Sequence, residues 1–145
     1  MERFYAEVPA ARELADRSVG ILVFPRVYKA GLGVGFAAGD GALQVHGQTV
    51  QYYRTTSASF GFQIGAQGRT EIVLFRTQEA LDKFRASQNW QAGIDGSIAV
   101  VQFGVGKSID TDNVRDPIIG FIFDNKGLMY DLSFKGAKYW KIDKQ

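Results

Sequence analysis

This chain has 145 residues and a nearly balanced charge, with 17 Lys and Arg against 15 Asp and Glu and a formal net charge of +2. The balance argues against the basic stripe of a nucleic-acid-binding protein, and the absence of cysteine excludes disulfides, thiolate metal sites and a cysteine nucleophile. The length predicts one domain over residues 1–145, and the lack of an apolar run of about 18 residues argues against a transmembrane span.

The first half of the chain predicts a short helix followed by strands. A helix is expected over residues 9–17, because the segment begins with a proline and places alanine and leucine on one face. The apolar run at residues 19–24 predicts a buried strand stopped by the proline that follows it, and residues 25–31 predict a turn. Residues 39–41 (Gly-Asp-Gly) are typical of a hairpin, and residues 42–55 predict one or two further strands with a bend near Gly47.

The second half of the chain predicts more strands and one clear helix. Residues 58–67 place bulky apolar residues on one side and small or polar residues on the other, which is the pattern of a half-buried strand. Residues 70–75 predict a central strand, because their second half is apolar throughout. Thr77 is expected to cap a helix that ends near Ser87. Further strands are predicted over residues 97–105, 118–123 and 128–134.

Together these elements predict an α+β domain. The expected architecture is a strongly coiled antiparallel β-sheet or a partly closed barrel, with two or three short helices. Glycines alternate with bulky residues over positions 31–38, and bare positions of this kind let strands bend and approach each other closely.

The patterns that resemble catalytic or ligand motifs each lack a required part. Gly106-Lys107-Ser108 follows a predicted strand, but Val101 stands where a phosphate loop has its opening glycine. Asp110 begins a calcium-loop pattern that fails at Val114. His46 is the only histidine, so neither a histidine-paired nucleophile nor a multi-histidine metal site is possible, and we expect it on the polar face of a strand. The sequence therefore predicts no catalytic residue, no metal ligand and no cofactor.

Cations and aromatic residues occur together in two places. The predicted turn carries Arg26, Tyr28 and Lys29, and the C-terminal region carries Lys138 and Trp140 among further lysines and aromatic residues. Tyr and Trp partition to the bilayer interface, and each Lys or Arg near an anionic membrane adds about 1 kcal/mol of binding free energy. The pattern indicates a surface that contacts phospholipid headgroups, or alternatively a solvated strand rim whose aromatic residues pack inward.

Several sequence blocks occur in the order typical of the SYLF domain family, and the chain resembles a bacterial member of that family. The blocks are GILVFPRVYKAGLGVGF (20–36), SFGFQIGAQ (59–67) continued by EIVLFRTQEALDKF (71–84), GIDGSIAV (93–100) and NKGLMYDLSFKG (125–136). The resemblance implies a lipid-binding module. Eukaryotic members are associated with phosphoinositide membranes and with actin, and bacterial members look like envelope proteins. The resemblance also implies lipid contact through an N-terminal amphipathic helix, which here carries Arg12 and Arg17.

We therefore expect a non-catalytic domain that binds phosphoinositide or anionic phospholipid at the surface of a membrane. The residues expected to contact lipid are Arg26, Lys29, Tyr28, Arg12, Arg17, Lys138 and Trp140. The alternatives are a protein-interaction module, with actin binding as the eukaryotic precedent, and a carrier of an apolar ligand. The resemblance implies a location in the periplasm or outer membrane, reached through a removed N-terminal lipoprotein leader, or alternatively at the cytoplasmic membrane surface.

Overall fold

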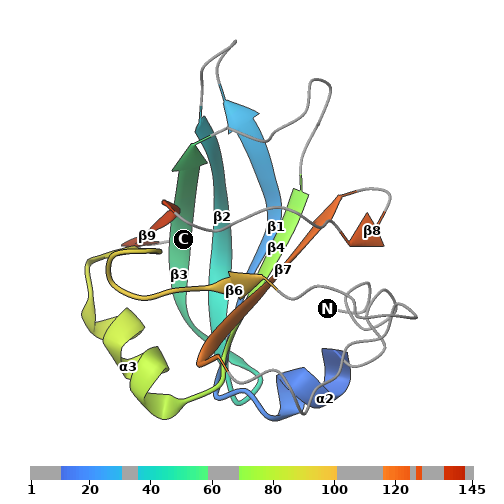
Figure 1. Ribbon diagram of the computed structural model, residues 1–145, viewed down its shortest axis with the longest axis vertical. Helices are drawn as coiled ribbons and strands as arrows, with labels where there is room; N and C mark the ends of the chain where they lie inside the picture. The colour runs from blue at the N-terminus through green and yellow to red at the C-terminus, as the bar shows by residue number, and fades with distance from the viewer. Residues whose placement is uncertain are drawn as a thin grey trace.

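The fold is built around one large β-sheet, seen in a computed structural model that describes residues 11–30, 36–58, 69–100, 116–124, 127–128 and 136–142 (Figure 1). The helices of these ranges are α2 (Ala11–Asp16) and α3 (Gln78–Ala86). The strands are β1 (Gly20–Ala30), β2 (Phe36–Val45), β3 (Gln48–Ala58), β4 (Arg69–Phe75), β5 (Asn89–Gln91), β6 (Ala99–Val100), β7 (Ile118–Asp124), β8 (Gly127–Leu128) and β9 (Lys138–Ile142).

The sheet is almost entirely antiparallel. Its strands lie in the order β5-β9-β3-β2-β1-β4-β7-β6, with β8 paired to β7, and only the β6–β7 pair is parallel among the described strands. The two end strands of this order, β5 and β6, do not pair with each other, so the strongly twisted sheet is open and not a closed barrel (Figure 1). The prediction of an α+β domain with a coiled antiparallel sheet and short helices is confirmed.

Strand β1 continues through Pro25 to Ala30, so the prediction of a strand that ends at residue 24 and a turn over residues 25–31 was wrong. At the proline the register of β1 shifts against both neighbours, between Val23 and Arg26 toward β2 and between Phe24 and Val27 toward β4. A bulge leaves its extra residue outside the hydrogen-bond ladder, so the missing N–H of Pro25 is tolerated there. The Pro25 carbonyl accepts a 2.9 Å hydrogen bond from the hydroxyl of Thr70 on β4.

The β2–β3 hairpin turns at His46 and Gly47, where a bend was predicted, and not at residues 39–41, where a hairpin was predicted. Both turn residues have positive φ, 54° for His46 and 80° for Gly47, which a two-residue type I′ turn requires. Gly41 instead lies inside β2, where an added Cβ would contact the Val23 carbonyl oxygen and come within 2.6 Å of the Phe24 ring. Gly41 therefore allows β1 and β2 to approach closely, and His46 lies in a turn and not on the polar face of a strand.

The inner face of the sheet packs against α3. Thr77 caps this helix as predicted, and its hydroxyl accepts a 3.1 Å hydrogen bond from a backbone N–H of the first turn. Leu81 and Phe84 of α3 are buried in the core. The Phe84 ring lies 4.8 Å from the ring of Tyr53 and 4.8 Å from the ring of Phe75, measured between centroids. These contacts fill the space between the helix and the sheet with aromatic side chains.

The other predicted elements are confirmed where they fall on described residues. The helix expected at residues 9–17 is α2. Strand β4 is central, as predicted, because it lies between β1 and β7 and its residues 71–75 are all buried. The strand predicted at residues 118–123 is β7. Strand β6 lies in the first part of the strand predicted at residues 97–105, and β8 overlaps the start of the strand predicted at residues 128–134. The later residues of both predicted strands lie outside the described residues. Residues 59–67 of the strand predicted at residues 58–67 also lie outside them. Strands β5 and β9 were not predicted.

Candidate functional site

Four of the residues expected to contact lipid lie in two adjacent rows across the sheet. Strands β9, β3, β2 and β1 are consecutive neighbours. In the first row the backbone register pairs Trp140 with Arg54, Arg54 with Asp40, and Asp40 with Arg26. The two predicted clusters, far apart in the sequence, thus lie in the same row, with β2 and β3 between them.

The second row lies next to the first. The register pairs Lys138 of β9 with Thr56, Thr56 with Ala38, and Ala38 with Tyr28 of β1. Lys29 follows in β1 and pairs with Ala37. The structure does not describe the side chains of Arg26, Tyr28 and Lys29, so only their backbone positions are placed.

The exposed side of these rows is the face of the sheet that points away from the core. Along β3, Tyr53 and Thr55 are buried, while Tyr52 and Arg54 between them are exposed. Since successive side chains of a strand point to opposite faces, alternate residues define what we call the outer face. Its members with described side chains on these three strands are Ala38, Asp40 and Ala42 of β2, Val50, Tyr52, Arg54 and Thr56 of β3, and Lys138, Trp140 and Ile142 of β9.

The outer face combines apolar and basic groups. Val50 and Tyr52 are among the exposed large hydrophobic residues, with 40% and 37% of their surfaces accessible. Trp140 is partly buried, and Lys138 of the neighbouring row is exposed. Aromatic rings beside flexible cations are suited to a boundary between water and an apolar phase.

An ion pair lies at the centre of the outer face. Arg54 donates two hydrogen bonds to Asp40 on the adjacent strand, from Nε to Oδ1 at 2.7 Å and from Nη2 to Oδ2 at 3.2 Å. The hydrogen bond to this carboxylate raises the pKa of Arg54 above its ordinary value. Both side chains stay accessible, 47% for Arg54 and 33% for Asp40. The guanidinium is therefore held in place by Asp40, and only its remaining N–H groups face solvent.

A groove of about 640 Å³ borders the outer face at the β5–β9 edge. Its lining consists of Gln88, Asn89, Trp140 and Lys141. The register places Asn89 opposite Trp140, so the groove continues the first row past β9. One ammonium group, one indole and two amides can together contact a polar group that carries negative charge.

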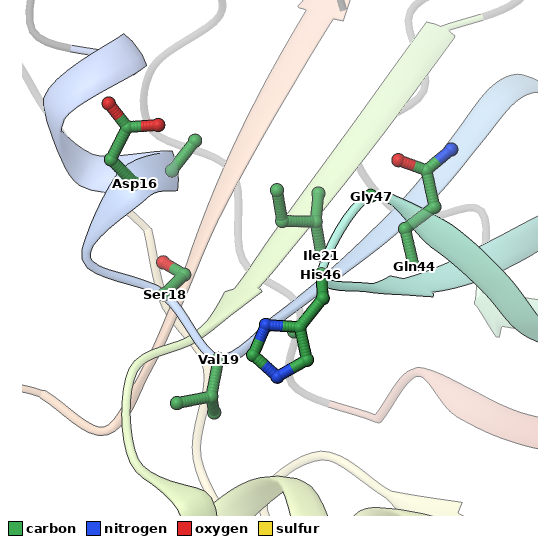
Figure 2. A pocket seen from close by; sticks show the side chains of 9 residues that line it. Asp16, Ser18, Val19, Ile21, Gln44, His46 and Gly47 are labelled. Carbon is green, nitrogen blue, oxygen red and sulfur yellow. The ribbon is translucent and has the colours of Figure 1, made fainter.

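A second pocket, of about 330 Å³, lies at the start of β1, between the end of α2 and the β2–β3 turn (Figure 2). Asp16, Ser18, Gln44 and His46 contribute polar groups to it. The Ser18 hydroxyl donates a 2.7 Å hydrogen bond to the Leu14 carbonyl, which closes the end of the helix. No group of three or more His, Cys, Asp or Glu side chains in the described residues could hold a metal ion.

The two N-terminal arginines are not part of the rows. Arg17 is exposed directly after α2, between the pocket residues Asp16 and Ser18 in the chain, and Arg12 lies in α2 with a side chain that is not described. Residues of the outer face, above all Asp40, Tyr52 and Arg54, were not predicted from the sequence. Burial alternates along β3 in the structure, but Tyr and Thr occur on both faces of this strand, and the sequence does not show which strands pair with it.

The inner face holds polar groups that are buried. Tyr53 is 1% exposed, and burial raises the pKa of its hydroxyl to about 12. Among the described residues, its hydroxyl oxygen has no hydrogen-bond partner. Thr55 and Glu71 are also buried.

The motif-like segment around Gly106-Lys107-Ser108 and Asp110 lies outside the described residues. In the ranges that are described, no helix has the length and apolar character needed to cross a membrane.

The chain is similar to a known family and to a curated bacterial protein. The family model Ysc84, described as "Las17-binding protein actin regulator", matches residues 56–144. Beta cell expansion factor A of Aeromonas veronii is 28% identical over 143 residues, an alignment that covers 98% of this chain and 52% of the relative. The chain thus spans about half the length of the curated relative that it matches.

Proposed function

This chain belongs to the SYLF family, because the Ysc84 model, which describes the SYLF domain, matches residues 56–144. We propose that it is a non-catalytic domain that binds phospholipid membranes at their surface. The outer face and the groove beside Lys141 form the contact surface. Anionic phospholipids, with phosphoinositides among them, are the proposed ligands. The proposed location is a bacterial cell envelope, at a periplasmic or outer-membrane surface.

One observation carries this proposal: the sheet register brings Arg26 and Tyr28 of β1 into the same two rows as Lys138 and Trp140 of β9. A single surface can engage several headgroups at once, which separate clusters at opposite ends of a molecule cannot do. Each cation near an anionic bilayer adds about 1 kcal/mol, so a few of them give appreciable binding despite the low net charge.

The shape of the contact favours peripheral binding. The outer face presents Tyr52 and Trp140, which are of the residue types found at the headgroup level of membranes. Its cations sit among these rings, and lysine stems can lie along apolar surface while the ammonium stays in water. A binding mode of this kind requires no catalytic group.

Vesicle flotation tests the proposal. The purified chain is mixed with phosphatidylcholine vesicles, with vesicles that also contain phosphatidylserine, and with vesicles that contain a phosphoinositide, each at low and moderate salt. We expect flotation with the anionic vesicles that weakens as salt rises, because exposed charges are screened. Absence of flotation with every vesicle would contradict a membrane role for this chain.

A charge-matched pair of variants locates the surface. Arg26→Glu combined with Lys138→Glu places two negative charges in neighbouring rows of the sheet. Lys83→Glu combined with Arg85→Glu makes the same change of charge on α3, on the inner side of the sheet. The first variant is expected to lose most of its binding to anionic vesicles, and the second to keep it. Equal losses would show that only net charge matters.

A protein-interaction role is the second candidate, and the description of the family model as a Las17-binding actin regulator favours it. Cosedimentation with actin filaments separates the two functions. Pelleting with filaments, together with no flotation, would support the protein-interaction role. The carrier hypothesis has less support, because aromatic rings from β3, β4 and α3 fill the described part of the inner face.

A further inference from the structure

The turn after β5 displays an isoleucine at its tip. Ile94 is 74% exposed, the most accessible of the large hydrophobic side chains in the described residues. A scattered exposed hydrophobic residue needs no explanation by itself. What distinguishes Ile94 is the construction of the turn that carries it.

The turn is tightly hydrogen-bonded. Gly93 N–H donates to the Gly96 carbonyl at 2.6 Å, and the N–H groups of Ile94 and Asp95 donate to the Gln91 carbonyl at 3.2 and 2.9 Å. Gln91 N–H donates in return to the Asp95 carboxylate at 2.7 Å. The acidic side chain is thus tied to the backbone at the base of the turn, and the apolar one is left at its tip.

The base of the turn is anchored in the core. Trp90, which is 3% exposed, packs against Gly96 so closely that an added Cβ would lie 2.7 Å from its ring. Gly93 has a φ of 94°, which favours glycine. A turn fixed in this way holds Ile94 in place before any partner arrives, which reduces the entropy lost on binding.

The turn lies beside the cations of the outer face. Gln91 pairs with Lys138, and two hydrogen bonds of 2.9 Å join the next residue, Ala92, to the chain just before β9: Ala92 N–H donates to Ala137, and Gly136 N–H donates to Ala92. Strand β5 therefore lies along the β9 edge of the sheet, and the turn that carries Ile94 follows it. The turn thus begins directly after the residue that pairs with Lys138 of the outer face.

We infer that Ile94 is an apolar anchor that enters the boundary between headgroups and acyl chains when the outer face docks on a membrane. This inference rests on the proposed function and adds a residue to it. A lipid boundary fits Ile94 better than a protein pocket does, because the neighbours in the turn are glycine and aspartate and add little apolar area. Stable protein interfaces bury about 800 Å² on each partner, whereas a lipid boundary can accept one side chain.

Ile94→Ser and Ile94→Leu test the anchor in the full chain. An isoleucine gains free energy when it moves from water to an apolar environment and a serine does not, so Ile94→Ser is expected to lower the affinity for vesicles of phosphatidylcholine and phosphatidylserine by roughly tenfold or more. Ile94→Leu should bind like the wild type. Both variants should melt with the wild type, because a side chain that is 74% exposed contributes little to folding.

Salt and self-association distinguish the outcomes. The fold-change caused by Ile94→Ser should be the same at low and high salt, whereas the fold-change caused by Lys138→Glu should shrink as salt rises. Wild-type affinity in Ile94→Ser, together with weaker binding of Lys138→Glu, overturns the anchor and leaves the proposed function standing. If the wild type itself fails to bind vesicles, both fall. A wild-type dimer that Ile94→Ser converts to a monomer overturns the lipid assignment in favour of a second copy of the chain.

Discussion

Arg54 and Asp40 form a two-point ion pair across neighbouring strands, with the Arg54 Nε 2.7 Å from Asp40 Oδ1, in the middle of the surface proposed to meet the membrane. The pair has a consequence for binding. Asp40 occupies the guanidinium that an anionic headgroup would otherwise contact, so a headgroup must compete with an internal carboxylate. The ion pair therefore lowers the affinity of the outer face for anions while it fixes the position of Arg54.

Asp40→Asn should strengthen binding to anionic vesicles. The substitution frees Arg54 for a headgroup, and one additional available cation adds about 1 kcal/mol, which is roughly a fivefold gain in affinity. Glu79→Gln is the matched control, because it also removes one negative charge and one exposed ion pair, that of Glu79 with Lys83 on α3. A titration of both variants with vesicles measures the difference, and equal gains would contradict the competition.

Tyr53→Phe should lose less free energy of unfolding than the wild type does as the pH becomes alkaline. The folded-state pKa of Tyr53 is about 12, above the ordinary value of 10.0, so as pH rises the unfolded chain loses this proton first. The stabilisation is complete below pH 10.0 and falls away between 10.0 and about 12, by at most about 2–3 kcal/mol. Urea unfolding of wild type and variant across this range gives the difference. A wild-type curve parallel to that of the variant would argue against burial of the hydroxyl in the fold.

The same variant should be at least as stable as the wild type at neutral pH. In the described structure the Tyr53 hydroxyl is buried without a hydrogen-bond partner, and removal of an unpaired buried polar group is neutral or stabilising by about 1 kcal/mol. Thermal melting at neutral pH measures it. A clear loss of stability would mean that the hydroxyl has a partner, such as a bound water.

Thr77→Ala should destabilise the domain by about 1 kcal/mol, the usual cost of a lost N-cap. The Thr77 hydroxyl accepts a hydrogen bond from the first turn of α3, and α3 carries Leu81 and Phe84 into the core. Thr77→Ser keeps the hydroxyl and should retain most of the stability. Chemical denaturation of the two variants measures the free energy of unfolding. If Thr77→Ser loses as much stability as Thr77→Ala, the hydroxyl does not stabilise the helix.

Gly41→Ala should cost about 1–3 kcal/mol, although alanine suits a strand better than glycine does. The new Cβ would meet the Val23 carbonyl oxygen, a backbone atom that cannot turn aside, and the Phe24 ring. Ala42→Ser, at the next position and on the outer face, is the control and should unfold near the wild-type denaturant midpoint. A stabilised Gly41→Ala variant would contradict the close approach of β1 and β2.

Much of the fold could be predicted from local pattern. The helix after Thr77 carries its own cap and apolar face, and the run at residues 70–75 has the composition of a central strand. Pro25 and the glycines at 39–41 misled the prediction, because both act through neighbours that are distant in sequence. A bulge shared with β2 and β4 accommodates the proline, and the packing of β1 on β2 requires Gly41.

The candidate site could be predicted only in part. Basic and aromatic composition identified Arg26 and Trp140 separately, but their common row depends on the pairing of four strands, which no local pattern specifies. Arg54 and Asp40 were missed for the same reason, since each is an ordinary polar residue until β2 and β3 pair. The proposed role of Ile94 likewise depends on the contact between β5 and β9.

Tryptophan fluorescence tests most directly whether the outer face touches the membrane. The chain has 2 tryptophans, of which Trp90 is buried in the core and Trp140 is partly exposed on the outer face. On addition of vesicles that contain phosphatidylserine, we predict a blue shift of emission and quenching by brominated acyl chains, both absent in Trp140→Phe. Vesicle binding with an unchanged wild-type emission spectrum and no quenching would show that the membrane meets another surface, and would contradict the account.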